Sequence, residues 1–424
     1  MKTYITNARV VLLDQVLENA ALVIEDEFIT AINPLNPCVD RTLDLDGALL
    51  MPGLIDLHCD QIEKLIEPRA GVHFDFSFAL AESDRRNASC GITTTFQSVS
   101  FAHAELGVRN DAMAKKIVES VHAFRSTALI DHRVHCRYEI TDPYGLQYLL
   151  DLLDRKQMDL ISLMDHTPGR RQYRDSRSYE VYLENAYRIS TDQARELIRA
   201  KQENSSGALD RVEQLIAKAH TMRVPIASHD DDSKEHVDFL SRHGGAISEF
   251  PVTLEAAAAA HAAGLKTVFG SPNVLRGKSQ GGGIRAIDAI QQDVVDCLCS
   301  DYYPATLLAA LILIPRVSNW ELSRAVRLAT ANPAEAAGLH DRGEIAVGKR
   351  ADVIAVTMIG ESPHVSRVWV AGQLAYHAEF HHRKGNASEY PSNQRATITS
   401  DGEDWDSTSS LANVPIARYE AKPQ

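Results

Sequence analysis

Short apolar runs alternate with longer stretches of helical periodicity between residues 53 and 335, and this alternation restricts the fold more than any other feature. Eight runs have the length and composition of buried strands, and they lie at 54–60, 92–99, 134–140, 160–166, 225–231, 246–251, 267–272 and 296–301. Helices are predicted at 107–124, 145–156, 208–221, 253–263, 284–292 and 320–331. The pattern predicts an α/β fold, a (β/α)₈ TIM-type barrel, although a doubly wound sheet has the same alternation.

Both ends of the chain have strand-like patterns without such helices. Residues 1–52 contain β-branched and apolar runs between polar turns, and residues 336–380 contain strand–turn–strand segments with glycine at the turns. We expect these segments to form one small β-sandwich domain beside a barrel of residues 53–335. Residues 381–424 are polar and predict a flexible tail or a surface wrap. The Arg- and Tyr-rich segment 167–207 follows the fourth strand, so it is expected to be an insertion at the mouth of the barrel.

The net charge of the chain limits the kinds of partner that it can bind. A formal net charge of -13 argues against a general nucleic-acid binder, but a pocket with local Arg residues and metal ions could still bind a polyanionic small molecule. The six cysteines form no CxxC pair, which favours reduced thiols. The first residues lack the pattern of a signal peptide, and the most apolar run, 305–315, is too short to span a bilayer. We therefore expect a cytoplasmic protein without a membrane partner.

The segment MPGLIDLHCD (51–60) carries the strongest local signal for chemistry. Pro52 and Gly53 end the preceding strand, and His58 and Asp60 follow two residues apart on the next one. Side chains at i and i+2 of a strand point to the same side, so both would face the barrel axis at the carboxyl end of the strand. An imidazole with a carboxylate suits Zn²⁺, Mn²⁺ or Fe²⁺.

Other predicted strands also end in residues that can bind a metal. These residues are Glu139 on the third strand, Asp165 and His166 on the fourth, His229 on the fifth, Glu249 on the sixth and Asp301 on the eighth. Each one alone could be a satisfied polar group or a helix cap. Together they can supply a site for one or two metal ions, with a metal-bound hydroxide as nucleophile and a carboxylate as its base.

These motifs resemble the amidohydrolase superfamily. The resemblance rests on PGLIDLHCD, the later strand-five histidine, SDYYPA (300–305) and the stretch NPAEAAGLHDRGEIAVGKRADVIAV (332–356). It implies a metal-bearing barrel flanked by a β-sandwich made from both termini. In detail the chain is most similar to a subgroup that acts in phosphonate catabolism, in the carbon–phosphorus lyase pathway, and the similarity covers nearly all of residues 1–376.

The resemblance implies roles for individual residues. His58 and Asp60 stand where the superfamily usually has two histidines, His229 corresponds to the strand-five ligand, and Asp301 corresponds to the strand-eight ligand and catalytic base. Glu249 lies near the position of the usual strand-six histidine. Because no lysine stands at the expected place on strand four, Glu139 or Asp165 would supply the bridging carboxylate. The implied cofactor is one or two divalent ions, with Zn²⁺ favoured over Mn²⁺ or Fe²⁺.

The subgroup also implies a reaction. Water would attack the phosphoanhydride between the α- and β-phosphoryl groups of a ribose triphosphate, α-D-ribose 1-methylphosphonate 5-triphosphate, and release pyrophosphate. Cations would bind the triphosphate, because Arg pairs well with phosphoryl oxygens. The candidates follow or lie on the predicted strands, and they are Lys64, Arg69, Arg137, Arg170, Arg171, Arg174, Arg276 and Lys278.

Two other functions fit parts of the pattern. The chain could be an amidohydrolase that acts on a C–N bond, such as a cyclic amide or a deacetylase substrate. It could also be an inactive barrel that serves as a scaffold in a complex. The Arg-rich segment and RGKS (276–279) favour a phosphorylated substrate over a neutral amide, and the metal-binding residue types at several strand ends count against the scaffold. A homo-oligomer is possible in each case.

Overall fold

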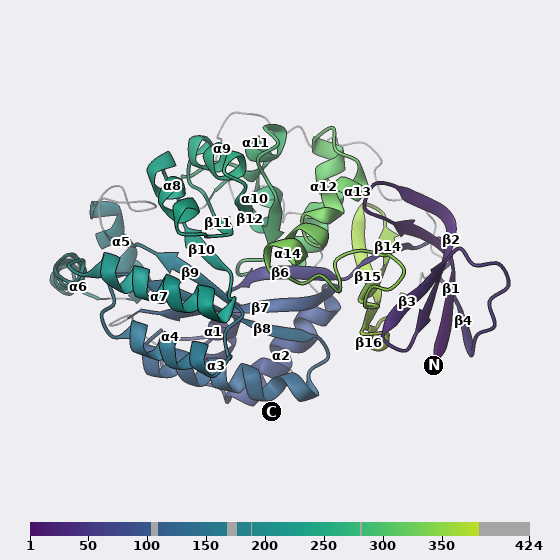
Figure 1. The fold of residues 1–424 in the computed structure, drawn as a ribbon, viewed down its shortest axis with the longest axis horizontal. Helices are drawn as coiled ribbons and strands as arrows, with labels where there is room; N and C mark the ends of the chain where they lie inside the picture. Colours follow the sequence, from purple (N-terminus) through teal and green to yellow (C-terminus); the bar gives the residue numbers. More distant parts are fainter. Residues whose placement is uncertain (103–108, 168–175, 188, 280–281, 381–424) are drawn as a thin grey trace, which may run out of the picture. The chain divides into compact units, whose positions relative to one another are not determined.

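The computed structural model describes residues 1–102, 109–167, 176–187, 189–279 and 282–380. Two sheets organise this part of the chain (Figure 1). One is a parallel sheet of eight strands with helices between them, and the other is a mainly antiparallel sheet of eight strands from both ends of the chain. The predicted barrel with a β-domain from both termini is therefore confirmed. The predicted tail, 381–424, lies outside the described residues.

The parallel sheet contains all eight predicted barrel strands. They are β6 (Leu54–Cys59), β7 (Ile92–Phe101), β8 (Asp131–Glu139), β9 (Leu160–Met164), β10 (Ile226–His229), β11 (Ile247–Glu249), β12 (Lys266–Gly270) and β13 (Cys297–Cys299). Their hydrogen-bonded order follows the sequence from β6 to β13. A doubly wound sheet reverses its order at a switch point, so this order excludes that alternative.

The barrel is nearly closed, and its seam lies between β6 and β13. Near the carboxyl ends, the Asp60 amide donates to the Asp301 carbonyl at 2.8 Å, and the Asp301 amide donates to the His58 carbonyl at 2.9 Å. Lower down, the amides of Ile55 and Leu298 donate instead to the carbonyls of residues 329 and 328, each at 2.7 Å. The seam therefore brings together three residues that the sequence predicts to bind a metal.

Helices connect the strands and cover the barrel. They are α1 (Gln61–Ile66), α2 (Phe76–Ser89), α3 (Asp111–Phe124), α4 (Gly145–Asp154), α5 (Ser176–Tyr187), α6 (Thr191–Asn204), α7 (Ala208–Met222), α8 (Lys234–Arg242), α9 (Leu254–Ala262), α10 (Ser271–Arg276), α11 (Ala286–Gln291), α12 (Ala305–Val317), α13 (Leu322–Arg327) and α14 (Ala331–Ala336), with a 3₁₀ turn at Arg125–Thr127. The six predicted helices correspond to α3, α4, α7, α9, α11 and α13. None of the described helices is both long and apolar enough to cross a membrane.

The second sheet joins the two ends of the chain. Its strands are β1 (Lys2–Val11), β2 (Val16–Glu25), β3 (Phe28–Ile32), β4 (Arg41–Asp44), β5 (Leu49–Pro52), β14 (Val353–Ile359), β15 (Ser362–Val370) and β16 (Gln373–His377). The order is β16-β15-β14-β5-β1-β2-β3, and β4 also pairs with β1. Because β5 is parallel to β1 and antiparallel to β14, it links the amino-terminal strands to the carboxyl-terminal ones. The domain boundaries at residues 52, 335 and 380 stay a prediction.

The insertion after β9 contains helical structure that the sequence analysis did not assign. Helices α5 and α6 lie within it, and Ser190 and Gln193 form a capping box at the start of α6. Tyr179, Leu183 and Ala194 form a small apolar cluster between the two helices. The insertion is thus a helical pair after the fourth barrel strand, although residues 168–175 lie outside the described part.

The interior of the barrel is layered by polarity. Apolar side chains such as Leu57, Phe96 and Val268 fill its lower part. Above them, buried polar groups such as His58, His135 and Glu249 occupy the carboxyl ends of the strands. A buried polar layer of this kind is costly unless its members pair with one another or with a ligand.

Candidate active site

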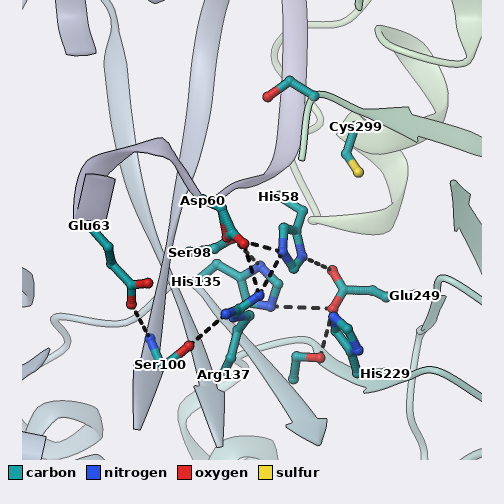
Figure 2. Close-up of polar contacts among 12 residues, drawn as sticks. His58, Asp60, Glu63, Ser98, Ser100, His135, Arg137, His229, Glu249 and Cys299 are labelled. Atoms are coloured by element: carbon teal, nitrogen blue, oxygen red, sulfur yellow. Dashed lines mark hydrogen bonds and ion pairs between the residues drawn. The ribbon is translucent and has the colours of Figure 1, made fainter. Parts of the chain in front are cut away.

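Three overlapping groups of imidazoles and carboxylates lie at the carboxyl ends of the barrel strands. In each group, one potential ligand atom per residue lies within 4.8 Å of the others, and the groups are His58–Asp60–Asp301, His166–His229–Asp230 and His58–His229–Glu249. The ring centroids of His58 and His229 are 5.7 Å apart, and those of His166 and His229 are 6.1 Å apart. The groups therefore form one continuous cluster, part of which Figure 2 shows.

The first group lies at the barrel seam. Asp60 Oδ1 is 3.6 Å from His58 Nε2, and this buried oxygen accepts no hydrogen bond. Asp301 has a left-handed backbone with φ of 56°, which an aspartate adopts only at some cost. Burial and the nearby Asp60 raise the pKa of Asp301 to about 6. The seam thus holds two carboxylates and one imidazole close together.

Glu249 fixes the orientation of His58 from behind. Glu249 is fully buried, its Oε1 lies 3.2 Å from His58 Nδ1, and its Oε2 accepts a hydrogen bond from Ser162 Oγ at 2.7 Å. Burial opposes a charge on His58, but Glu249 and Asp60 outweigh it and raise the pKa of His58. The geometry nevertheless favours a neutral ring, because the Arg137 guanidinium lies 3.2 Å from Nε2 and can only donate. Nδ1 then carries the proton toward Glu249, and Nε2 accepts from Arg137, with Asp60 Oδ1 beside it at 3.6 Å.

The second group repeats this arrangement around His166. His166 Nδ1 is 2.9 Å from Glu139 Oε2, and His166 Nε2 is 3.8 Å from Asp230 Oδ2. Asp230 Oδ2 also lies 3.0 Å from His229 Nδ1. Burial lowers the pKa of His166, but Asp230 and Glu139 outweigh it and raise the pKa to about 9. In both groups one carboxylate lies behind a histidine and a second lies in front of it.

Glu139 has a further partner that the sequence analysis missed. Lys201 of α6 places its ammonium 3.3 Å from Glu139 Oε2, and Thr141 Oγ1 donates to the other oxygen at 2.9 Å. Although burial opposes the charge of Glu139, Lys201 and His166 hold its pKa well below the usual range. The helical insertion thus contributes a cation to the cluster.

His135 lies below this cluster on β8. Its Nδ1 is 3.0 Å from the Leu57 carbonyl, and its Nε2 is 3.6 Å from Glu249 Oε2 (Figure 2). Burial, together with the neighbouring His58 and Arg137, lowers the pKa of His135 to about 3, so this ring is neutral. The Glu249 carboxylate therefore lies between two imidazoles inside the barrel.

The predicted metal ligands take different places in and around the cluster. The seam joins His58, Asp60 and Asp301, whereas His229 belongs to a group with His166 and with Asp230, which was not among the predicted ligands. Glu139 and Glu249 lie behind the histidines. Asp165 is buried and accepts a hydrogen bond from the Thr167 amide at 3.1 Å, but it belongs to none of the three groups.

Of the predicted phosphate-binding cations that the structure describes, one lies within the cluster and the others do not. Arg137 is buried within the cluster, where Nη1 lies 3.4 Å from Asp60 Oδ2. Four others are exposed, and none of the contacts found among the described residues joins them to the cluster; they are Lys64, Arg69, Arg276 and Lys278. Three lie outside the described residues, namely Arg170, Arg171 and Arg174.

Asp56 is a further site residue that the sequence analysis did not select. It is fully buried and accepts hydrogen bonds from the Ser300 amide at 2.9 Å and the His58 amide at 3.3 Å. Its carboxylate therefore connects β6 to the segment that leads into Asp301. The register of β6 against β7 shifts between Asp56 and Cys59, so the two-residue spacing of Asp56 from His58 does not place them on one strand face, and no local spacing could have identified Asp56.

The chemistry of the cluster fits a divalent metal. Imidazole nitrogens and carboxylate oxygens are the donors that Zn²⁺ and similar ions take in proteins. The buried Asp60 Oδ1 accepts no hydrogen bond, and a bound cation would satisfy it. Two groups share no residue, the seam group and the His166–His229–Asp230 group, so the described residues offer places for two ions.

A barrel of parallel strands with this cluster at its carboxyl end, and with a sheet from both chain ends, defines a class of barrel enzymes with candidate metal centres. Residues 118–375 match the model of the Amidohydrolase family, and the chain belongs to this family of hydrolases. The resemblance inferred from the motifs is therefore confirmed.

Individual relatives support the same assignment. The chain is 31% identical over 377 residues to the alpha-D-ribose 1-methylphosphonate 5-triphosphate diphosphatase of Escherichia coli (strain K12). The matched region covers 88% of this chain and 100% of that protein. Among solved structures, it is similar to N-acetylglucosamine-6-phosphate deacetylase from Pasteurella multocida, with a TM-score of 0.60 and 15% identity over 88% of this chain and 99% of the other. Dihydropyrimidinase from Brevibacillus agri NCHU1002 has a TM-score of 0.54 and 13% identity, over 88% and 95% of the two chains. At such identities the two structures support the fold alone.

Proposed function

We propose that the protein is a metal-dependent diphosphatase that cleaves the α–β phosphoanhydride of a ribose 5-triphosphate and releases pyrophosphate. The position of Arg137 carries this proposal, because its buried guanidinium lies beside His58 and Asp60. A phosphoanhydride presents anionic oxygens that such a cation can stabilise, whereas a neutral amide does not require it. The similarity to the whole length of the E. coli diphosphatase supports α-D-ribose 1-methylphosphonate 5-triphosphate as the substrate.

The seam group and the His166 group would hold the metal ions. Ions bound there would polarise the phosphoryl oxygens and lower the pKa of a coordinated water. His58, Asp60 and Asp301 would hold one ion, and His166, His229 and Asp230 would hold the other. Glu249 and Glu139 keep the two ligand histidines oriented through their Nδ1 atoms, as carboxylates behind metal-binding histidines commonly do.

Asp301 is the general base in this proposal. Its carboxylate accepts the proton of the attacking water while Arg137 binds the phosphoryl oxygens. Its place at the barrel seam beside Asp60 and near His58 puts its carboxylate where a water held by the ion would lie.

The test is product analysis with the full-length, metal-loaded protein. With a ribose 5-triphosphate we expect ribose 5-phosphate and pyrophosphate in equal amounts. Orthophosphate as the only released product would contradict cleavage between the α- and β-phosphoryl groups. Parallel reactions with an N-acetyl amino sugar phosphate and a dihydropyrimidine examine hydrolysis of C–N bonds, and turnover of these compounds alone would replace the proposal with an amidohydrolase activity.

A further inference from the structure

A phenylalanine with a left-handed backbone lies inside the candidate metal cluster. Phe250 directly follows Glu249 at the end of β11, and its φ of 51° is unfavourable for a bulky side chain. Asp230 and Asp301 have similar φ angles of 58° and 56°, but an aspartate tolerates this region better because its short side chain can form local hydrogen bonds. Phe250 has no such means, so contacts made by its ring must offset the cost.

Neighbouring strands fix the backbone on both sides of this turn. The Phe250 amide donates to the Val268 carbonyl at 2.8 Å, and the Asp230 amide donates to the Glu249 carbonyl at 2.9 Å. The first bond ties residue 250 to β12, and the second ties the end of β11 to the residue that follows β10. The left-handed turn is therefore held within the barrel, and it sets the position of the Phe250 ring.

The ring of Phe250 packs against two of the candidate ligand histidines. Its centroid lies 5.0 Å from that of His58, with the ring planes at 82°, and 5.1 Å from that of His229, with the planes at 58°. The two imidazole centroids are 5.7 Å apart, and all three distances are typical of favourable aromatic pairs. His58 and His229 belong to the two groups that share no residue, so one ring contacts a ligand of each candidate ion site.

The ring also reaches the space beside Asp301. A methyl group on Gly270 would lie 3.6 Å from Phe250 Cε1 and 3.7 Å from Asp301 Oδ2, so the ring edge and the carboxylate both border this glycine. Phe250 is partly buried, and it packs against the apolar side chains that fill the lower part of the barrel. The ring therefore forms part of the boundary between the apolar interior and the candidate ligands.

We propose that Phe250 is a positioning residue of the metal centre, which holds His58 and His229 in the ring orientations that two neighbouring ions require. This inference rests on the proposed function, which places one ion on each histidine. The terminal torsion of a histidine is broad, so hydrogen bonds and packing decide where its ring nitrogens point. Glu249 fixes His58 at Nδ1, and contact with the Phe250 ring limits the rotation of both imidazoles.

A core-filling role would require apolar volume alone. Leucine supplies much of that volume, but it cannot reproduce the contacts of a flat ring with two imidazoles. Phe250→Leu therefore separates the two roles, and Phe96→Leu is its matched control. Phe96 is fully buried in the apolar lower part of the barrel, beneath the polar layer.

Cobalt(II) binding to the full-length protein tests the positioning role. The d–d absorption of Co²⁺ depends on the number and geometry of its ligands, and competition with a chelator measures the affinity. We expect Phe250→Leu to change this spectrum and to weaken Co²⁺ binding roughly 10-fold, at the lower end of the range for residues that support metal ligands. Phe96→Leu should lower the melting temperature, while its spectrum and affinity stay those of the wild type.

Two further variants test the cost of the backbone conformation. Phe250→Ala keeps a side chain on the left-handed residue, whereas Phe250→Gly removes both the ring and the strain. We expect the glycine variant to melt at a higher temperature than the alanine variant, and both to bind Co²⁺ more weakly than the wild type. Equal melting temperatures would contradict the argument that ring contacts offset an unfavourable backbone.

The outcomes separate the positioning role from the proposed function. A wild-type spectrum and affinity in folded Phe250→Leu would overturn the positioning role even if the wild type hydrolyses the triphosphate. A wild type that binds no Co²⁺ would overturn it as well. Conversely, altered Co²⁺ binding in Phe250→Leu, together with no turnover of the triphosphate by the wild type, would support the positioning role and contradict the diphosphatase. If Phe250→Leu does not fold, Phe250→Gly decides in its place.

Discussion

Glu249 provides the sharpest test of how the candidate metal centre is built. Its oxygens are already engaged on the far side of His58, since Oε1 faces His58 Nδ1 at 3.2 Å and Oε2 accepts from Ser162 Oγ at 2.7 Å. A carboxylate in this position makes the histidine a better ligand by orienting the ring and withdrawing its proton. We therefore expect Glu249 to strengthen metal binding without contacting the metal.

Replacement by glutamine isolates the charge of Glu249 from its shape. In Glu249→Gln the amide oxygen can still accept from His58 Nδ1, while the amide nitrogen can donate toward His135 Nε2, which has no hydrogen-bond partner. The fold should survive, and metal affinity should fall about 10- to 100-fold, or about 1.4–2.7 kcal/mol. Glu249→Ala also removes the hydrogen bonds of a fully buried group, so we expect a larger loss of affinity together with a lower melting temperature.

Competition with a chelator measures the affinity, and elemental analysis at saturating metal measures the number of bound ions. An orienting residue changes the affinity and leaves the number unchanged. Loss of one full equivalent of metal in Glu249→Gln would show that Glu249 is itself a ligand and would refute the reasoning. A metal affinity of Glu249→Gln equal to that of the wild type would also refute it, because the charge of Glu249 would then contribute nothing to metal binding. Glu213→Gln, at an exposed position on α7, is the matched control.

Four further changes test other parts of the site. His58→Ala should lower metal content, since it removes a residue shared by two candidate groups, and elemental analysis checks this. Asp301→Asn should reduce turnover of the triphosphate by about 10²- to 10⁴-fold with the melting temperature preserved, and an unchanged rate would remove Asp301 as the base. Lys201→Met should lower the free energy of unfolding by roughly 1–3 kcal/mol in urea titrations, because Glu139 loses its ammonium partner. Burial and Asp142 raise the pKa of Asp111 from 3.8 to about 7, so the folded state holds an extra proton between these values and the free energy of unfolding falls as the pH rises through them. Asp111→Asn should therefore stabilise the protein by about 1–2 kcal/mol at pH 8 and little at pH 4, and equal effects at both pH values would contradict this assignment.

The strands of the barrel could be predicted because each is a short apolar run. A strand of a parallel barrel is buried on both faces, so apolar residues follow one another along it. Helices were harder to predict where their pattern is atypical. Helix α12 is apolar on nearly all sides because it is buried, so it lacks the stripe that marks a surface helix. Helix α6 is strongly polar in composition and was therefore not predicted, yet the Ser190–Gln193 capping box marks its start and could have revealed it.

The sequence could predict which strand ends carry potential ligands, but it could predict contacts between these residues only where one strand carries the pattern. His58 and Asp60 are two residues apart, so their common face follows from strand geometry alone. The partnership of His58 with Glu249 joins residues 191 positions apart and depends on side-chain direction, which no local spacing specifies. Side-chain direction also decides which predicted cations reach the cluster. Arg137 points into the barrel, whereas exposed candidates such as Lys64 have no contact with the cluster among the described residues.

The repeated arrangement around His58 and His166 connects the fold to the proposed chemistry. In both cases a carboxylate faces Nδ1 and a second carboxylate lies beyond Nε2. The Glu139 behind His166 lies on β8, which pairs directly with β9, whereas the Glu249 behind His58 lies on β11, far from β6 along the sheet. Closure of the barrel is therefore what brings Glu249 and His58 together. An open sheet of the same strands could keep the His58–Asp60 pair, but it would separate His58 on β6 from Glu249 on β11 and so remove the group that orients the ligand.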